Sequence, residues 1–271
     1  MAEGIVLVGY GNMGGALARG WCERGIATAD ITVVDPAEAQ AGAARAAGLH
    51  ALSGADELDA ALAPACVVFA VKPQVMDGVV PEYGRFSGSG AVFLSIVAGK
   101  TLASLQAALG SAAAVVRAMP NLPATVGRGM SVACANQAVN ETGRTTCSEL
   151  LAAVGEVAWV EDEALLDAVT AVSGSGPAYV FLLIECLAAA GIEAGLSETL
   201  ALELAQATVA GAGELARRSD ESAAVLRQRV TSPGGTTQAA LEVLMGEAGL
   251  APLMRDAVAA AAARSRALAA A

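Results

Sequence analysis

Apolar and polar positions divide the chain into two parts. Up to about residue 160, short continuous apolar runs alternate with amphipathic or alanine-rich stretches. The apolar runs predict strands at residues 5–8, 31–35, 66–71, 91–97, 113–117, 130–134 and 157–160. Helices are expected at residues 12–24, 37–47 and 102–109. Continuous apolar strands separated by helices are typical of a parallel sheet with both faces covered.

Strand patterns end near residue 162, and the rest of the chain has the pattern of long helices rich in alanine and leucine. Pro177 suits the first turn of a helix that runs to residue 190. On that helix one apolar face is formed by Val180, Leu183, Ile184 and Leu187. Further helices are expected at residues 197–218 and 221–230, with two more after residue 237. The helix that runs to residue 190 is expected to end at Gly191 and Gly195. Ser197 and Asp220 are the predicted N-caps of the next two helices, and the last helix is expected to begin near Pro252.

The helices of the second part are too apolar to bury all their faces within one domain of about 110 residues. The small residues 210–213 permit close packing against another helix. We therefore expect a homodimer at least.

A glycine pattern follows the first predicted strand directly. Gly9 permits a tight turn, Gly11 lets the backbone approach a pyrophosphate, and Gly14 lets the next helix pack close to the strand. The N–H groups at the helix start, including those of Asn12 and Met13, face such an anion. This predicts a dinucleotide site, with an ordinary strand-to-helix turn as the alternative.

The predicted fold is therefore α/β. A Rossmann-type nucleotide-binding domain is expected at residues 1–162, followed by an all-helical substrate-binding and dimerisation domain at residues 163–271.

Asp35 ends the second predicted strand, 21 residues after Gly14. A carboxylate at this place can accept a hydrogen bond from a ribose 2′-hydroxyl, which favours NADH over a cofactor with a 2′-phosphate. The first basic residue after Asp35 is Arg45. The alternative is that Asp35, followed by Pro36, only starts a turn and caps the next helix.

Composition narrows the class of protein. The hydrophobic content is 55% and the mean hydropathy is +0.55, but much of this is alanine. The longest uncharged run is interrupted at residues 173–177, so no membrane span is expected. No basic segment precedes the first strand, so no signal peptide is expected and the protein is placed in the cytoplasm.

The net charge of −11 argues against nucleic acid and anionic membranes as partners. Five scattered cysteines and a single histidine predict reduced thiols and no metal site.

Two loops follow predicted strands. Lys72 and Pro73 lie at the carboxyl end of a strand, where ligands bind in such folds, although an ordinary strand exit would look the same. Asn121 follows Pro120 in a similar loop and offers both donor and acceptor groups. It could serve a cofactor or stabilise the loop itself.

Two glycine-rich segments with hydroxyls, residues 173–179 and 232–237, each open a helix. N–H groups and hydroxyls at a helix start form an uncharged receptor for a carboxylate or phosphate. A turn with an N-cap is the alternative.

Basic and acid–base groups are scarce. Lys72 and Lys100 are the only lysines, and His50 is the only histidine, in a segment that suggests a structural or surface role. Oxidation of an alcohol needs a general base, most often His or Lys, and the predicted helical domain contains neither. Reduction of a protonated C=N bond suits this composition, because the substrate already carries its proton.

Five segments, in this order and spacing, resemble pyrroline-5-carboxylate reductase. They are residues 9–14, 70–74, 119–121, 172–179 and 232–237. The resemblance implies reduction of 1-pyrroline-5-carboxylate to L-proline with NADPH or NADH, the last step of proline biosynthesis. It also implies an intertwined helical dimer, often assembled into a decamer, with an active site shared between subunits.

The resemblance also implies roles for single residues. Beside the glycine turn, the cofactor contacts are Ala70, Val71, Lys72 and Pro73. The substrate contacts are Ser175, Ser232, Gly234, Gly235, Thr236 and Thr237. Thr237 matches the catalytic threonine, and the upstream acidic residue corresponds to Asp220, with Glu221 adjacent.

Two positions depart from the pattern: Leu122 stands where a threonine is usual, and Asp35 stands where many members carry a small or basic residue.

Two other functions stay open. A related imine or β-hydroxyacid reductase is one, although the latter normally uses a helix lysine that this chain lacks. A nucleotide-sensing module without turnover is the other.

Overall fold

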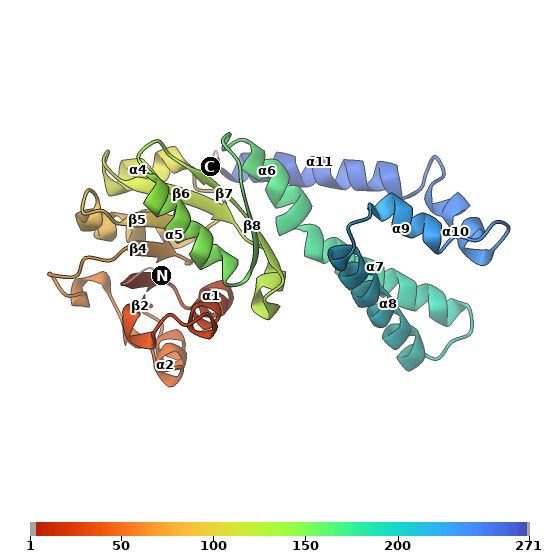
Figure 1. Cartoon of the computed structure of the whole chain (residues 1–271), viewed down its shortest axis with the longest axis horizontal. Helices are drawn as coiled ribbons and strands as arrows, with labels where there is room; N and C mark the ends of the chain where they lie inside the picture. Colours follow the sequence, from red (N-terminus) through yellow and green to blue (C-terminus); the bar gives the residue numbers. More distant parts are fainter. Residues whose placement is uncertain (1–3, 270–271) are drawn as a thin grey trace. The chain divides into compact units, whose positions relative to one another are not determined.

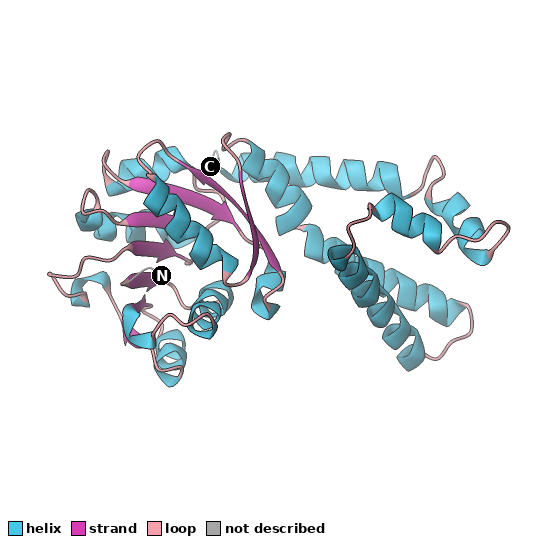
Figure 2. Cartoon of the chain, in the orientation of Figure 1, coloured by secondary structure: helices cyan, strands magenta, loops and turns pink. Residues whose placement is uncertain are grey.

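The computed structural model describes residues 4–269, which form two compact units. The first comprises the chain up to Gly174 together with the segment from Ala262 onward, and the second is Ser175–Ala261. The first unit extends beyond the predicted boundary at residue 162, because Leu166 is buried in its core. Figures 1 and 2 show the strands in the first unit and helices in the second.

One eight-stranded sheet forms the centre of the first unit, in the order β3-β2-β1-β4-β5-β6-β7-β8. Its strands are β1 Ile5–Val8, β2 Ile31–Val34, β3 His50–Leu52, β4 Cys66–Phe69, β5 Val92–Ser95, β6 Ala114–Met119, β7 Gly129–Ala135 and β8 Gly155–Trp159. All seven predicted strands are confirmed, and β3 was not predicted. The order reverses beside β1, which pairs with both β2 and β4, and ligands bind at such a switch point.

The sheet is not wholly parallel as predicted, because β6 and β7 are antiparallel. Only residues 120–128 separate these strands, and they hold the short 3₁₀ segment η5, Leu122–Val126. A parallel pair needs a crossover of about a dozen residues or more, so this link permits only the antiparallel pair. The strand β8 then pairs parallel with β7.

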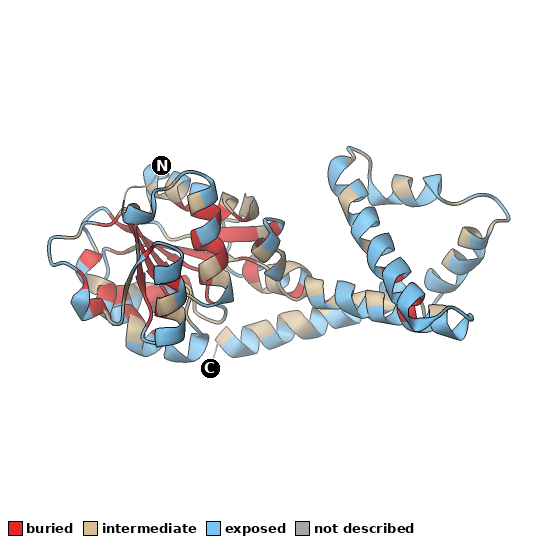
Figure 3. Ribbon diagram, turned by 90° about the horizontal axis from the view of Figure 1, so that it is seen from below, coloured by how far each residue is buried: buried red, intermediate tan, exposed pale blue. Residues whose placement is uncertain are grey.

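Successive strand residues enter two separate cores, one on each face of the sheet. Figure 3 shows that the strands of the first unit are largely buried. The helices of the first unit are α1 Asn12–Glu23, α2 Glu38–Ala46, α3 Met76–Val79, α4 Leu102–Leu109, α5 Glu141–Ala152 and α6 Leu165–Val169. Helices α1, α2 and α5 cover the face that contains Leu7, while α3, α4 and α6 cover the face that contains Val6 and Val8. The indole of Trp21 donates to the carbonyl oxygen of Leu150 at 2.9 Å and so joins α1 to α5.

The second unit is helical, as predicted. It contains α7 Gly176–Glu193, α8 Glu198–Arg218, α9 Ala223–Arg229, α10 Thr236–Leu244 and most of α11 Leu250–Ala269. Ser197 caps α8 as predicted, accepting from the Leu200 N–H at 3.4 Å.

Asp220 does not cap α9, contrary to our prediction. The helix begins two residues later than expected, and Ser222 accepts from the Val225 N–H at 3.4 Å. Gly191 does not end α7 but lies within it, because the absence of a side chain lets Ala201 of α8 approach to 3.3 Å from its Cβ position.

The interruption predicted at residues 173–177 is reduced to a bend at Ser175. A π-helical turn, Thr170–Gly174, follows α6, and helix continues after Ser175, because Pro177 lies in the first turn of α7 where its missing N–H needs no partner. The run Leu165–Glu193 is long and apolar enough to cross a membrane by length and composition. A core or interface helix of a soluble protein meets the same criterion.

Apolar side chains of the second unit remain largely exposed. Of its residues, all of them described, only Ala188, Ala201 and Ala205 are buried. The predicted apolar face of α7 is open at Val180 and Leu183, which are 43% and 45% exposed.

Candidate dinucleotide and substrate sites

The three glycines after β1 have three different surroundings. Gly9 has a φ of +96°, and a Cβ there would stand 2.9 Å from the carbonyl carbon and oxygen of Ala70. A Cβ on Gly14 would stand 2.2 Å from the Gly9 oxygen, so the turn and the helix touch there. A Cβ on Gly11 would meet no protein atom within 4 Å. The turn is thus closed at Gly9 and Gly14 and open at Gly11, where a pyrophosphate fits.

The start of α1 suits an anion. Gly11 is the N-cap and provides no side-chain hydrogen bond, and the first turn contains no acidic residue. The first intrahelical bond runs from the Gly15 N–H to the Gly11 carbonyl oxygen at 2.8 Å. The N–H groups of Asn12, Met13 and Gly14 therefore face outward at the positive end of the helix dipole.

The segment after β4 lies against this turn. The N–H of Ala70 donates to the Val8 oxygen at 2.8 Å, and the Val71 side chain lies 2.9 Å from the Cβ position of Gly9. Lys72 and Pro73 follow as exposed residues at the carboxyl ends of β1 and β4. The structure thus brings two of the predicted cofactor segments together.

Asp35 is buried and accepts two backbone hydrogen bonds. Oδ2 accepts from the Tyr10 N–H at 2.8 Å, and Oδ1 accepts from the Ala37 N–H at 3.0 Å. The carboxylate therefore ties the glycine turn to Ala37, the N-cap of α2. Asp35 starts a turn there, as the alternative predicted, but it does not cap the helix, because α2 has no side-chain cap. Each oxygen has a further lone pair, so a bond to a ribose hydroxyl stays a prediction.

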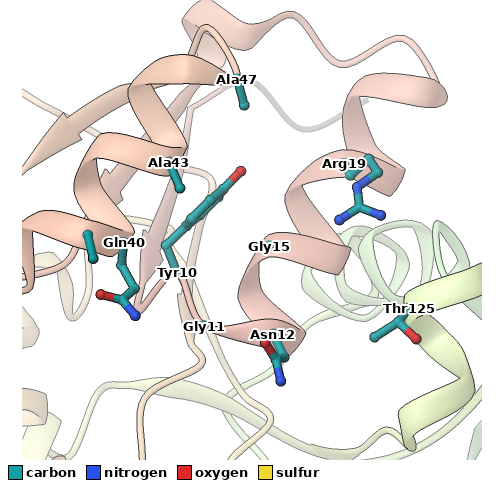
Figure 4. A pocket seen from close by; sticks show the side chains of 10 residues that line it. Tyr10, Gly11, Asn12, Gly15, Arg19, Gln40, Ala43, Ala47 and Thr125 are labelled. Carbon is teal, nitrogen blue, oxygen red and sulfur yellow. The ribbon is translucent and has the colours of Figure 1, made fainter.

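An open pocket of about 510 Å³ borders the turn (Figure 4). It is lined by Tyr10, Gly11, Asn12, Gly15, Arg19, Ala39, Gln40, Ala43, Ala47 and Thr125. The ring of Tyr10 projects between α1 and α2, and its burial raises the pKa of the phenol, an effect that Arg19 opposes. Arg19 is the one cation among these lining residues.

Asn121 uses its side-chain amide within the protein. Oδ1 accepts from the Met130 N–H at 2.9 Å, and Nδ2 lies 3.2 Å from both the carbonyl oxygen and the hydroxyl of Ser173. A Cβ on Gly174 would stand 2.6 Å from the Met119 methyl carbon. The loop after β6 therefore holds the π-helical turn, which supports the loop-stabilising alternative; cofactor contact by Asn121 stays a prediction.

Residues 232–237, which we call the substrate turn, form a tight turn followed by the first residues of α10. The Gly235 N–H donates to the Ser232 oxygen at 3.0 Å, and Gly234 has a φ of +71°. The Gly234 N–H donates to Oε1 of Gln238 at 2.8 Å. The N–H groups of both glycines thus have partners within the protein, and the receptor role of this segment stays a prediction for its other N–H groups and its hydroxyls. Thr236 and Thr237 open α10, which has no side-chain cap.

Two acidic neighbours differ in their contacts. Oε1 of Glu221 accepts from Arg229 at 2.6 Å, and its Oε2 is buried without a hydrogen-bond partner in the described structure. Asp220 is exposed.

Ser175 stands at the N-cap position of α7. His50 is exposed on β3, apart from the glycine turn.

A Rossmann-type sheet with this glycine turn at its switch point is typical of proteins that bind a dinucleotide. Comparison with known proteins agrees. A family described as "NADP oxidoreductase coenzyme F420-dependent" matches residues 4–99, and "Pyrroline-5-carboxylate reductase dimerisation" matches residues 163–268.

Curated and solved relatives extend the match to the whole chain. A pyrroline-5-carboxylate reductase of Pseudomonas aeruginosa is 41% identical over 98% of this chain and 96% of its own. The Coxiella burnetii reductase structure is 34% identical with a TM-score of 0.93, and that of Plasmodium falciparum, with NADP bound, is 31% identical with a TM-score of 0.83. Each covers 98% of both chains. The chain belongs to the pyrroline-5-carboxylate reductase family, which confirms the predicted family and makes the protein an NAD(P)H-dependent oxidoreductase.

Sequence reasoning missed one residue of the substrate turn's surroundings, Gln238. The only available signal was its spacing, three residues after the helix N-cap Gly235, which is typical of a side chain that reaches back to the cap.

Proposed function

We propose that the protein reduces 1-pyrroline-5-carboxylate to L-proline with a reduced nicotinamide cofactor, as the last step of proline biosynthesis. The observation that carries this function is the substrate turn at the start of α10, on a chain whose other unit carries the open glycine turn. Family membership supports it across nearly the whole chain.

The first unit holds the cofactor in this proposal. Its pyrophosphate is bound by the N–H groups at the start of α1, over the open position at Gly11. The full cofactor set is Gly9, Gly11, Asn12, Met13, Gly14, Asp35, Ala70, Val71, Lys72, Pro73 and Asn121. When bound, the reduced nicotinamide supplies the hydride for the imine carbon.

The substrate turn holds the imine acid. The outward N–H groups of Thr236 and Thr237, with their hydroxyls and that of Ser232, hold the carboxylate and the ring nitrogen. Gly234 and Gly235 contribute the shape of the turn, because their own N–H groups have internal partners. Ser175 completes the substrate set.

Thr237 is the proposed catalytic residue, together with an acidic residue at Asp220 or its neighbour Glu221. The Arg229 contact and the unpartnered oxygen of Glu221 make Glu221 the stronger competitor for that role. Asp220→Ala and Glu221→Ala, compared in turnover of the imine, separate the two.

The function is tested by NAD(P)H oxidation with 1-pyrroline-5-carboxylate, against a β-hydroxyacid with NAD. Turnover of the imine is expected. Thr237→Ala should lower kcat at least about 100-fold, because it removes a hydroxyl at the reacting ring, while exposed His50→Ala should leave kcat within about twofold. Comparable losses would contradict the site, and cofactor binding without turnover would favour a nucleotide sensor.

The cofactor preference is proposed to be for NADH. A 2′-phosphate would meet the carboxylate of Asp35, which two N–H groups hold in place. Asp35→Ser should move the ratio of kcat/KM for NADPH over NADH upward by about tenfold, as removal of one like-charge repulsion implies. Asp35→Asn also removes the charge but keeps one acceptor oxygen for an anchoring N–H, so it should raise the ratio with less loss of anchoring. An unmoved ratio in both variants would leave Asp35 as an anchor only.

We also propose a cytoplasmic homodimer at least, formed through the second unit. Exposed Val180 and Leu183 on α7 provide an apolar face for a partner helix. Gly211 and Gly213 have no atom within 4 Å of their Cβ positions, which leaves room for such a helix. Light scattering should give a mass of at least twice the 26.8 kDa of one chain, with a decamer as the larger assembly; a monomer would contradict the proposal.

A further inference from the structure

We propose that Gln238 is a positioning residue that locks the peptide plane at the centre of the substrate turn and so keeps the substrate groups of that turn in place. The inference rests on the proposed function only for its effect on the imine. The lock itself is a property of the fold.

The substrate turn contains one peptide that could take two orientations. Ser232 to Gly235 form a β-turn closed by the 3.0 Å bond from the Gly235 N–H to the Ser232 oxygen. Pro233 at the second position and Gly234 at the third, with its φ of +71°, make this a type II turn. Type I and type II turns differ by a rotation of the central peptide, which here joins Pro233 to Gly234.

Gln238 holds that peptide in the type II orientation. Its Oε1 accepts from the Gly234 N–H at 2.8 Å. The N–H of Gly234 and the carbonyl of Pro233 belong to one plane and point in opposite directions. After rotation a carbonyl oxygen would face Oε1 of Gln238, and two acceptors cannot pair.

The position of Gln238 in α10 explains why its side chain reaches the Gly234 N–H. Gly235 is the N-cap, so Gln238 is the third helical residue. A Gln or Glu at this place characteristically bends back to an N–H group at the start of the helix. Gln238 bonds the residue just before the cap and leaves the N–H groups of Thr236 and Thr237 for a ligand.

Glu242 sets the orientation of the Gln238 amide. Its Oε1 accepts from Nε2 of Gln238 at 3.2 Å, one helical turn further along. A carboxylate only accepts hydrogen bonds, so it pairs with the amide nitrogen and directs the amide oxygen towards Gly234. In the series of hydrogen bonds from Gly234 through Gln238 to Glu242, each donor therefore meets an acceptor.

The test removes the hydrogen bonds of Gln238 without shortening the side chain. Gln238→Met keeps the length of the side chain and removes both hydrogen bonds. The kcat/KM for 1-pyrroline-5-carboxylate should fall about fivefold, as the loss of one ordinary hydrogen bond implies, while the KM for NADH changes less than twofold. Hydrogen exchange at the Gly234 amide, followed by NMR, should accelerate by a similar factor. Gln238→Ala serves as a second variant if the methionine packs in a new way.

Glu242 provides the matched pair of controls. Glu242→Gln keeps an acceptor for Gln238 and should behave as the wild type. Glu242→Lys supplies only donors, which turn the amide of Gln238 over and bring its nitrogen against the Gly234 N–H. That variant should lower kcat/KM for the imine as Gln238→Met does.

Unchanged Gly234 exchange in both Gln238→Met and Gln238→Ala would overturn the lock. Equal effects of Glu242→Gln and Glu242→Lys would overturn the role of Glu242 in orienting the Gln238 amide. Absence of imine turnover in the wild type would instead refute the proposed function, and the exchange measurement would still decide on Gln238.

Discussion

Gly11 and Gly14 differ in what a single methyl group would meet. Gly14→Ala places a carbon 2.2 Å from the Gly9 oxygen, so the strand-to-helix junction must shift, at a cost of about 2–4 kcal/mol in the free energy of unfolding. Gly11→Ala places a carbon in open space with a φ of −75° that any residue adopts, so stability should change by less than about 0.5 kcal/mol.

Gly11→Ala should weaken NADH binding strongly, although it hardly changes stability. The added carbon stands where the pyrophosphate approaches, and we expect the Kd for NADH to rise at least about tenfold, a loss of roughly 1.4 kcal/mol. Urea unfolding and NADH fluorescence titration measure the two effects separately. If Gly11→Ala binds NADH as the wild type does, the pyrophosphate does not lie over this residue.

Glu163 connects three elements of the first unit. Its Oε1 accepts from Nη1 of Arg117 on β6 at 2.7 Å and from the Leu102 N–H at the start of α4 at 2.8 Å, just before α6 begins. The Arg117 side chain is 9% exposed and that of Glu163 27%. Removing the carboxylate leaves a nearly buried guanidinium without this partner.

We expect Glu163→Ala to lower the free energy of unfolding of the first unit by about 2–3 kcal/mol, below the full cost of breaking a buried pair because Glu163 is partly exposed. Glu163→Gln keeps an acceptor for both donors and should lose about 1 kcal/mol. Urea unfolding followed through Trp21 and Trp159 provides the measurement. Equal losses in the two variants would show that packing, not the acceptor, matters here.

At the scale of elements, the sequence predicted the strands whose burial produces a clear apolar pattern. Strands β1, β4 and β5 are buried along their whole length and appear as continuous apolar runs. Strand β3 has three residues, of which His50 is exposed, so no pattern marks it. The direction of β7 depends on the length of the link from β6, because alternation of side chains is the same in both directions.

Helix caps and site residues were harder to predict, because they depend on contacts that form only in the folded chain. Ser219, Asp220 and Ser222 are all good N-caps, and only the packed chain selects Ser222. The glycine turn could be predicted because Gly9 and Gly14 meet a local steric need and the spacing of the three glycines is itself a local pattern. The use of Asn121 and Gln238 depends on partners that folding brings to them.

At the scale of the whole molecule, the two units bury apolar surface differently. The sheet unit has a core on each face, whereas the helical unit buries three alanines and exposes side chains such as Phe181, which is 50% exposed. A unit of this kind is stable when a second copy covers it. The match of residues 163–268 to the family's dimerisation domain agrees with this reading.

A shared active site, which the family resemblance implies, can be tested with two inactive variants. Gly11→Asp adds a carboxylate in open space where the pyrophosphate should bind, and Thr237→Ala removes the proposed catalytic hydroxyl. Neither homodimer should turn over the imine. A purified heterodimer of the two, isolated through different tags, contains one site with both halves intact if each site combines the glycine turn of one chain with the substrate turn of the other. It should then show about half the activity of the wild-type dimer. If each chain builds its own site, both sites of the heterodimer carry a defect and the heterodimer stays inactive, while NADH binding by its Thr237→Ala chain confirms that the protein is folded.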